Sequence, residues 1–212
     1  MMKRTIKLCL LSSLLLSMPG FAGKVSLEYA GFHDRLKVVN RGEYPRVELT
    51  FSVPQTEGCK IVSGEITTET KRFPLTFTED QRLYIPFDDE LKTMRALVEL
   101  ETQGDAEGCG LALQIRERVP KAAYTAADLS ALKQEMDDLQ AALQGFPMKY
   151  FAKPADGIRF VFDEAETTVS RNGIESVVNG EFILGSNEID ATETLKFSKA
   201  AAVVSPWFNR AQ

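Results

Sequence analysis

Residues 125–145 read TAADLSALKQEMDDLQAALQG, and this stretch decides how the rest of the chain is organised. Thr125 and Asp128 form a variant of the capping box, a side-chain pattern that opens many helices. Gly145, with a proline two residues further on, is typical of a helix end. The sequence therefore predicts one helix over residues 126–144.

The predicted helix has one apolar face. Its apolar residues recur at spacings of three and four, which is typical of an amphipathic helix. They are Leu129, Leu132, Met136, Leu139 and Leu143. Such a face could form a coiled-coil seam, bind in a partner's groove, or cover the chain's own sheets. Coiled coils usually sustain three to four heptads. This face barely exceeds two, so we expect it to pack within the chain.

Strand patterns lie on both sides of the helix, where apolar and polar residues alternate with a period of two. Before the helix they predict strands over residues 24–29, 47–53, 61–70, 73–77, 83–87, 96–101 and 111–117. After the helix they predict strands over 158–162, 182–184 and 195–197, with Asn-Gly turn signals at 172–173 and 179–180. An acidic turn between 73–77 and 83–87 indicates a hairpin.

Together these patterns predict a mainly β protein, in which one amphipathic helix joins two small antiparallel β-sandwich-like modules. After a signal peptide over residues 1–22, we expect a β-sandwich-like module over 23–118. A helical connector over 119–153 would follow, and a smaller β module would occupy 154–212. The connector ends in an apolar segment after the helix.

The first 22 residues have the order of a cleavable secretory signal. A basic start with Lys3, Arg4 and Lys7 precedes a run of nine largely apolar residues, and small residues precede a cut after Ala22. A membrane-spanning helix needs roughly 20 apolar residues, so we expect cleavage and not anchoring. The sequence thus predicts a periplasmic protein with no integral membrane segment after cleavage.

Cleavage would change both the charge and the cysteine content. It would remove three of the 25 basic residues and none of the 30 acidic ones, so the formal charge would fall from −5 to −8. An acidic chain is a poor match for nucleic acid or for an anionic lipid surface. Loss of Cys9 would leave Cys59 and Cys109, for which an oxidising compartment favours a disulfide. The alternative is two reduced, buried cysteines.

No pattern in the chain indicates a catalytic site or a cofactor. The single histidine, His33, precedes Asp34, but neighbours on a strand point to opposite faces. We therefore interpret His33 as a surface or hydrogen-bonded loop residue. One histidine with two paired cysteines does not supply the usual zinc ligands. The acidic turn at 88–90 lacks the spacing of a calcium loop. We expect no catalytic residue, no metal site and no cofactor.

Aromatic residues are the candidates for ligand binding. Tyr84, Tyr150 and Trp207, together with Phe151 and Phe208, could stack against a sugar or a peptide. The alternative is that they fill the cores of the two modules. Trp207 is the only tryptophan, whereas carbohydrate-binding surfaces usually present several.

Three segments carry a resemblance to a known family. Residues 25–37 (VSLEYAGFHDRLK), the alternating strand 47–53 and the closing Pro206-Trp207 resemble a family of small exported proteins of Gram-negative bacteria, catalogued as a domain of unknown function. The resemblance covers most of the mature chain. It implies a periplasmic location and implies no activity, substrate or site residue.

Two functions of different classes fit these patterns. The first is a non-enzymatic periplasmic protein that binds a protein or glycan partner through its β modules or its helix. The alternative is an envelope hydrolase that acts on glycan or peptide through unidentified carboxylates. The chain holds 30 acidic residues, and no pattern selects two of them.

Overall fold

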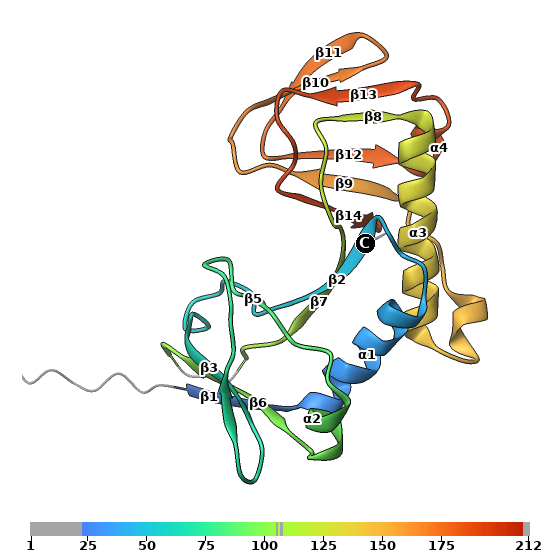
Figure 1. Ribbon diagram of the computed structural model, residues 1–212. Coiled ribbons are helices and arrows are strands. Elements are labelled where there is room, and N and C mark those ends of the chain that lie inside the picture. Colours follow the sequence, from blue (N-terminus) through green and yellow to red (C-terminus); the bar gives the residue numbers. More distant parts are fainter. Residues whose placement is uncertain (1–22, 105, 107, 210–212) are drawn as a thin grey trace, which may run out of the picture.

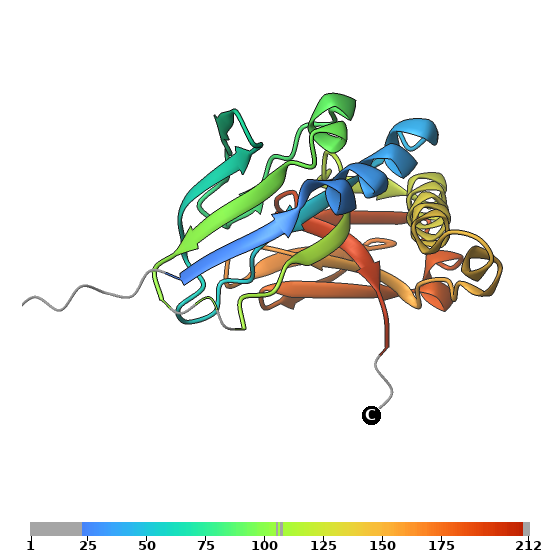
Figure 2. The ribbon, with the colours of Figure 1, turned by 90° about the horizontal axis from the view of Figure 1, so that it is seen from below.

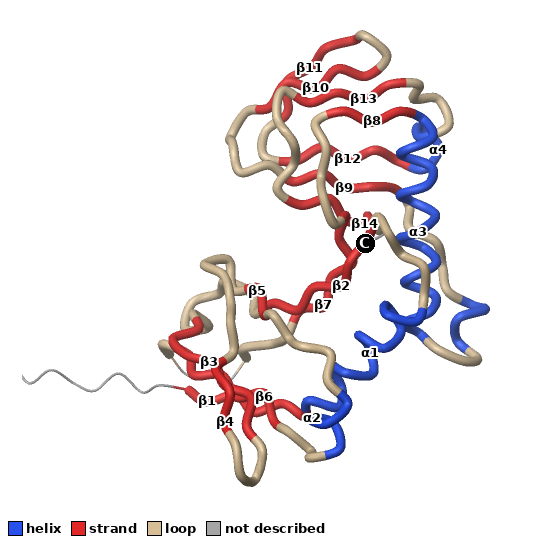
Figure 3. Tube along the Cα trace, in the orientation of Figure 1, coloured by secondary structure: helices blue, strands red, loops and turns tan. Residues whose placement is uncertain are grey.

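A computed structural model describes residues 23–104, 106 and 108–209 (Figure 1). The predicted export signal, residues 1–22, lies outside this part. Within it, no helix has both the length and the apolar character needed to cross a membrane. Two β modules lie next to each other, and helices line one side of them (Figures 1, 2 and 3).

The first module is built from the chain before the long helix. Its elements are β1 (Gly23–Glu28), α1 (Tyr29–Arg41), β2 (Val47–Ser52), β3 (Ile61–Thr67), β4 (Arg72–Pro74), β5 (Arg82–Leu83), α2 (Asp89–Thr93), β6 (Leu97–Thr102) and β7 (Ala112–Glu117). The strands form two antiparallel sheets with the orders β1-β6-β3-β4 and β5-β2-β7. The ring centroids of Phe32 on α1 and Phe51 on β2 lie 5.0 Å apart, so α1 packs on the second sheet.

The second module is built mainly from the chain after the long helix. The remaining elements are β8 (Ala123–Thr125), α3 (Ala126–Gln144), the 3-10 helix η1 (Met148–Phe151), β9 (Gly157–Val161), β10 (Thr167–Arg171), β11 (Ile174–Val178), β12 (Glu181–Gly185), α4 (Ser186–Ile189), β13 (Thr194–Phe197) and β14 (Val203–Trp207). They form two antiparallel sheets with the orders β11-β10-β13-β8 and β12-β9-β14. Because β8 pairs with β13, the segment before the helix also contributes to this module.

An aromatic core holds the two sheets of the second module together. The ring centroids of Phe160 on β9 and Phe197 on β13 are 4.9 Å apart. Tyr124 on β8 lies 5.5 Å from Phe160. Since these residues come from both sheets, the sheets face each other across the core. The prediction of a mainly β protein is confirmed.

The predicted hairpin over residues 73–87 is only partly correct. β4 pairs with β3 and β5 pairs with β2, so the two arms belong to different sheets. A single bridge, Phe77 with Leu83, joins the arms. Pro74 and Pro86 flank this bridge, and proline cannot donate a ladder hydrogen bond. The arms therefore stay short.

The predicted helix is confirmed over Ala126–Gln144, as α3. The Thr125 hydroxyl accepts a hydrogen bond from the Asp128 amide at 3.2 Å, and the Asp128 carboxylate accepts one from the Thr125 amide at 3.0 Å. These two bonds make the capping box that the sequence indicates. Gly145 ends the helix with a positive φ of 68°, a conformation in which glycine carries no penalty.

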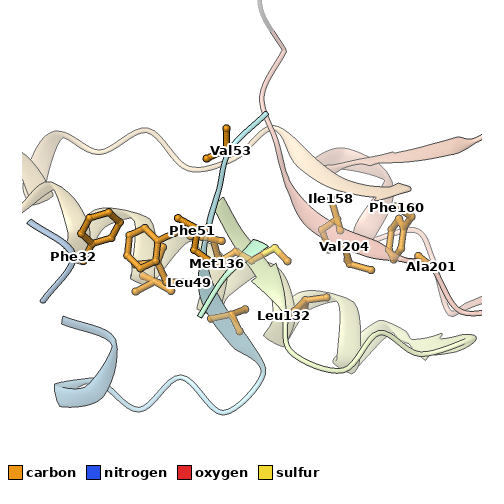
Figure 4. Close-up of a cluster of buried hydrophobic side chains, with 14 of the residues drawn as sticks. Phe32, Leu49, Phe51, Val53, Leu132, Met136, Ile158, Phe160, Ala201 and Val204 are labelled. Carbon is orange, nitrogen blue, oxygen red and sulfur yellow. The ribbon is translucent and has the colours of Figure 1, made fainter. Parts of the chain in front are cut away.

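The apolar face of α3 lies inside the molecule, as predicted. Leu132 and Met136 are at most 1% exposed. Figure 4 shows them between Leu49 and Phe51 of β2 and Ile158 of β9. The helix thus buries its apolar face against both modules and links their cores into one cluster.

A buried carboxylate also connects α3 to the first module. Glu135 lies on the buried side of the helix and is only 8% exposed. Its Oε1 accepts hydrogen bonds from the Arg46 amide at 2.7 Å and the Val47 amide at 3.3 Å. Arg46 Nη1 lies 3.1 Å from Glu135 Oε2. These bonds fix the start of β2 against the helix.

The interpretation of His33 as a surface or loop residue is wrong. The predicted strand over 24–29 ends at Glu28, and Tyr29 begins α1. His33 lies in this helix, is fully buried, and stacks on Phe87 with ring centroids 4.6 Å apart. Its Nε2 is 2.8 Å from Asp89 Oδ1 on α2. His33 therefore joins the two helices of the first module.

The predicted disulfide between Cys59 and Cys109 is confirmed. It joins the loop before β3 to the loop before β7, and the two Cα atoms are 5.4 Å apart. Because β3 and β7 belong to different sheets, the bond links the two sheets of the first module.

A second buried carboxylate, Glu117, should make stability depend on pH. Glu117 ends β7 and accepts a hydrogen bond from the Tyr124 hydroxyl at 2.6 Å. Burial raises the pKa of Glu117 above its ordinary value, and the Tyr124 bond opposes this shift less strongly. The folded protein therefore keeps this proton at pH values where the unfolded chain has lost it.

We expect the Glu117→Gln variant to lack this dependence. In the natural protein, the stabilisation from protonated Glu117 is complete below the unfolded pKa and is lost as the pH rises through the higher folded pKa. Urea unfolding from pH 4 to pH 8 should show the natural protein losing stability relative to the variant. A difference that is constant across this range, or one of opposite sign, would contradict the assignment.

Candidate ligand-binding groove

An open groove lies where the two modules meet. β7 of the first module lies next to β14 of the second (Figure 1), although no ladder joins these two strands in the described chain. Pro206 in β14 has no amide hydrogen, so it cannot donate a hydrogen bond to a strand beyond its own sheet. The groove encloses about 590 Å³. It is lined by Gln114, Arg159, Glu181, Ile183, Ser205, Pro206, Trp207, Phe208 and Asn209.

Strand register brings the polar residues of this groove together. Arg159 on β9 lies opposite Ile183 on β12 and opposite Ser205 on β14. Opposed residues, and residues two positions away, share one face of a sheet. Glu181 and Trp207 therefore lie on the same face as Arg159. The alternate residues of these strands point into the aromatic core.

Arg159 and Glu181 form an ion pair within the groove. Arg159 Nε and Nη2 lie 2.7 Å and 2.6 Å from Glu181 Oε2. The two side chains remain 47% and 45% exposed, so they can still bond to a ligand. On β7, Gln114 Oε1 accepts two hydrogen bonds from Arg116, at 2.9 Å and 2.6 Å, which leaves the amide nitrogen of Gln114 as a donor.

Trp207 supplies the aromatic surface of the groove. It is the only tryptophan and is half-buried at the end of β14. Its partners in register are Gly157 on β9 and, one strand further, Gly185 on β12. Since glycine has no side chain, neither β9 nor β12 places a side chain beside the indole at these positions. An aromatic plane beside a few polar groups is typical of sites that bind small ligands or peptides.

The five aromatic residues that the sequence singles out do not share one surface. Trp207 and Phe208 line the groove, and Tyr84, Tyr150 and Phe151 do not. Tyr84 lies on the first module beside a separate hollow, with Arg82 5.2 Å above its ring. Tyr150 lies in η1, after α3. Sequence patterns did not indicate Arg159, Glu181 or Gln114, because only the pairing of distant strands brings these residues together.

The acidic turn at residues 88–90 has a structural role. Asp88, in the acidic turn, caps α2 by accepting hydrogen bonds from the Glu90 amide at 2.7 Å and the Leu91 amide at 3.3 Å. Within the described residues, no three histidine, cysteine or acidic side chains are grouped so that they could hold a metal ion.

Two carboxylates share a surface hollow elsewhere in the first module. Glu57 and Glu79 line a space of about 410 Å³ close to the disulfide, together with Gln81. Both glutamates are exposed to solvent, whereas the general acid of a glycosidase usually lies in a pocket that limits water.

The fold and the groove define a mainly antiparallel β protein with two modules and an open, partly aromatic groove at their junction. The chain belongs to a family of proteins of unknown function, DUF2987, whose model matches residues 21–162. The match includes the first module, α3 and Arg159 on β9, and it ends before β12 and β14. Comparison with curated proteins and with solved structures gives no match.

Proposed function

We propose that this protein is exported to the periplasm and binds a glycan or protein partner through the groove at Trp207. The observation that carries the proposal is the arrangement of that groove. A half-buried indole, an exposed Arg–Glu pair and a glutamine amide line one space of about 590 Å³, and they come from four strands and both modules. Pockets of this size and composition suit ligands that offer an apolar face and several polar groups.

Export is supported by the amino-terminal sequence and by the disulfide. The first 22 residues have the order of a secretory signal. The Cys59–Cys109 bond closes a loop across the first module. Disulfides persist mainly in oxidising compartments, which include the bacterial periplasm.

A binding role fits the groove better than catalysis does. Among the described residues that line the groove, Glu181 is the only carboxylate, and its Oε2 is bonded to Arg159. Glycoside hydrolysis ordinarily needs two carboxylates on either side of the scissile bond. Within this groove, then, one carboxylate can orient a ligand but cannot form that pair.

For the hydrolase alternative, we consider the hollow that holds Glu57 and Glu79. It would require the protein to cleave peptidoglycan or peptides, and the Glu57→Gln and Glu79→Gln variants to lose that activity. Equal activity in these variants and in the natural protein would remove this hollow from consideration.

A pull-down tests the binding proposal. The protein, immobilised and incubated with periplasmic extract and with muramidase-released peptidoglycan fragments, should retain a protein or a glycan that mass spectrometry can identify. Recovery of full-length protein with Met1 intact from the cytosol would overturn the export part of the proposal. Failure to retain any component from either mixture would overturn the binding part.

The Arg159→Ala variant should weaken this binding by about tenfold to a hundredfold, because a hydrogen bond to a charged group contributes about 1.5–3 kcal/mol. The free energy of unfolding should change by less than about 1 kcal/mol, since the Arg159–Glu181 pair is exposed. Arg72→Ala is the matched control, because Arg72 forms a similar exposed pair with Glu65 at 2.9 Å outside the groove. Equal weakening by both variants would contradict a site at Arg159.

A further inference from the structure

The segment directly after α3 exposes an unusual amount of apolar surface. We name residues 146–153 the aromatic loop. Four of its large side chains are exposed: Phe146 82%, Met148 54%, Tyr150 70% and Phe151 75%. Apolar side chains gathered on a surface in this way commonly mark a site of interaction with a protein or a membrane.

The aromatic loop is a formed structure attached to α3. The Lys149 amide donates to the Gly145 carbonyl at 2.7 Å, and the Lys153 carbonyl accepts from Gln140 Nε2 at 3.0 Å. The Ala155 amide, just beyond the loop, donates to Asp137 Oδ1 at 2.7 Å. Because these bonds hold the backbone in place, the apolar side chains are presented with little further ordering needed on binding.

The local charge of this region differs from that of the whole chain. The chain carries 30 acidic residues, yet residues 139–155 contain none. Lys149 and Lys153 lie within this acid-free stretch. Lys149 Nζ lies 5.0 Å above the Tyr150 ring, so one positive charge is held beside the exposed aromatic group. The loop therefore matches an anionic surface, although the net charge of the chain does not.

We propose that the aromatic loop docks the protein on an anionic phospholipid bilayer. Tyrosine and lysine side chains are favoured where the acyl chains meet the headgroups, and phenylalanine can bury below them. The loop projects from the end of α3 away from the sheets of both modules (Figure 1), a shape that suits insertion into a flat surface. No loop residue lines the groove at Trp207, so docking would leave that groove open.

Vesicle flotation tests the docking. The chain beginning at Gly23, which contains every described element, is mixed with phosphatidylglycerol–phosphatidylethanolamine vesicles or with phosphatidylcholine vesicles. It should float with the anionic vesicles and much less with the neutral ones, and raised salt should reduce the difference. The Lys149→Gln/Lys153→Gln variant should bind the anionic vesicles about thirtyfold less, since each lysine near such a surface contributes about fivefold.

The Phe146→Ser/Phe151→Ser variant should lower the partition coefficient on anionic vesicles at least about tenfold. The matched control is Ile174→Ser/Val177→Ser, which removes two similarly exposed apolar side chains from β11, 76% and 62% exposed. This control should float like the natural protein. Circular dichroism melting should be unchanged in both variants, because none of these side chains is buried.

Three results would overturn the docking proposal. One is failure of the natural chain to float with either kind of vesicle. Another is equal flotation of the loop variant and the natural chain. The third is loop-dependent dimerisation in sedimentation equilibrium without flotation, which would assign the loop to a second copy of the chain. None of these results bears on the groove, whose ligand binding is measured without lipid.

Discussion

Replacing both Cys59 and Cys109 by serine is expected to lower the free energy of unfolding by about 4 kcal/mol. The disulfide closes a loop with a sequence separation of 50 residues, and the chain-entropy model gives about that value for a loop of this length. The bond also joins two loops that precede strands of different sheets, so its loss should loosen the first module. Urea unfolding under non-reducing conditions measures the effect.

Treatment with a reductant provides the matched comparison. Reduction should destabilise the natural protein by a similar amount and leave the double serine variant unchanged. A loss of less than about 1 kcal/mol in the variant would mean that the unfolded chain gains little freedom when the bond is absent. It would contradict the view that this bond stabilises the first module.

Phe160→Ala is expected to destabilise the protein by about 3–5 kcal/mol, the range for removing a large side chain from a packed core. Phe160 is completely buried. Its ring lies between the sheets of the second module, with centroids 4.9 Å from Phe197, 5.5 Å from Tyr124 and 6.1 Å from Phe182. The variant should leave a cavity that these neighbours fill only partly.

Two controls separate this packing effect from other causes. Phe160→Leu keeps much of the volume and should lose clearly less stability than Phe160→Ala. Arg159→Ala changes the adjacent residue on the opposite face of β9 and should leave stability almost unchanged. If Phe160→Ala cost no more than Arg159→Ala, the two sheets would not share the core described above.

Much of the fold could be predicted because the patterns that decide it are local. Alternation marked strands such as 47–53, and a capping box with regular spacing marked α3. The first helix was missed although Tyr29, Phe32, Leu36 and Val39 recur at spacings of three and four. The alternating pattern of β1 continues to Tyr29, the first residue of this helix, so the pattern assigns the start of the helix to the strand. The wrong interpretation of His33 followed from that error. The burial of His33 could not be predicted either, since its environment depends on α2 and Phe87, more than 50 residues away.

The candidate groove was predictable only in part. Trp207 stood out because it is the single tryptophan. Arg159 and Glu181 did not stand out, because their contact depends on the register of β9 with β12. The aromatic loop could be recognised from sequence as an apolar segment but not as an exposed one. Apolar residues are usually buried, and only the packing of the modules shows which of them remain exposed to solvent.

The intrinsic fluorescence of Trp207 tests the central claim most directly, because this residue is both the only tryptophan and part of the groove. Titration with muramidase-released peptidoglycan fragments, or with the periplasmic protein retained in the pull-down, should shift the emission and reach saturation. The same titration of Arg159→Ala should require at least about tenfold more ligand. Binding detected by calorimetry with no change in emission would place the partner elsewhere and contradict the account.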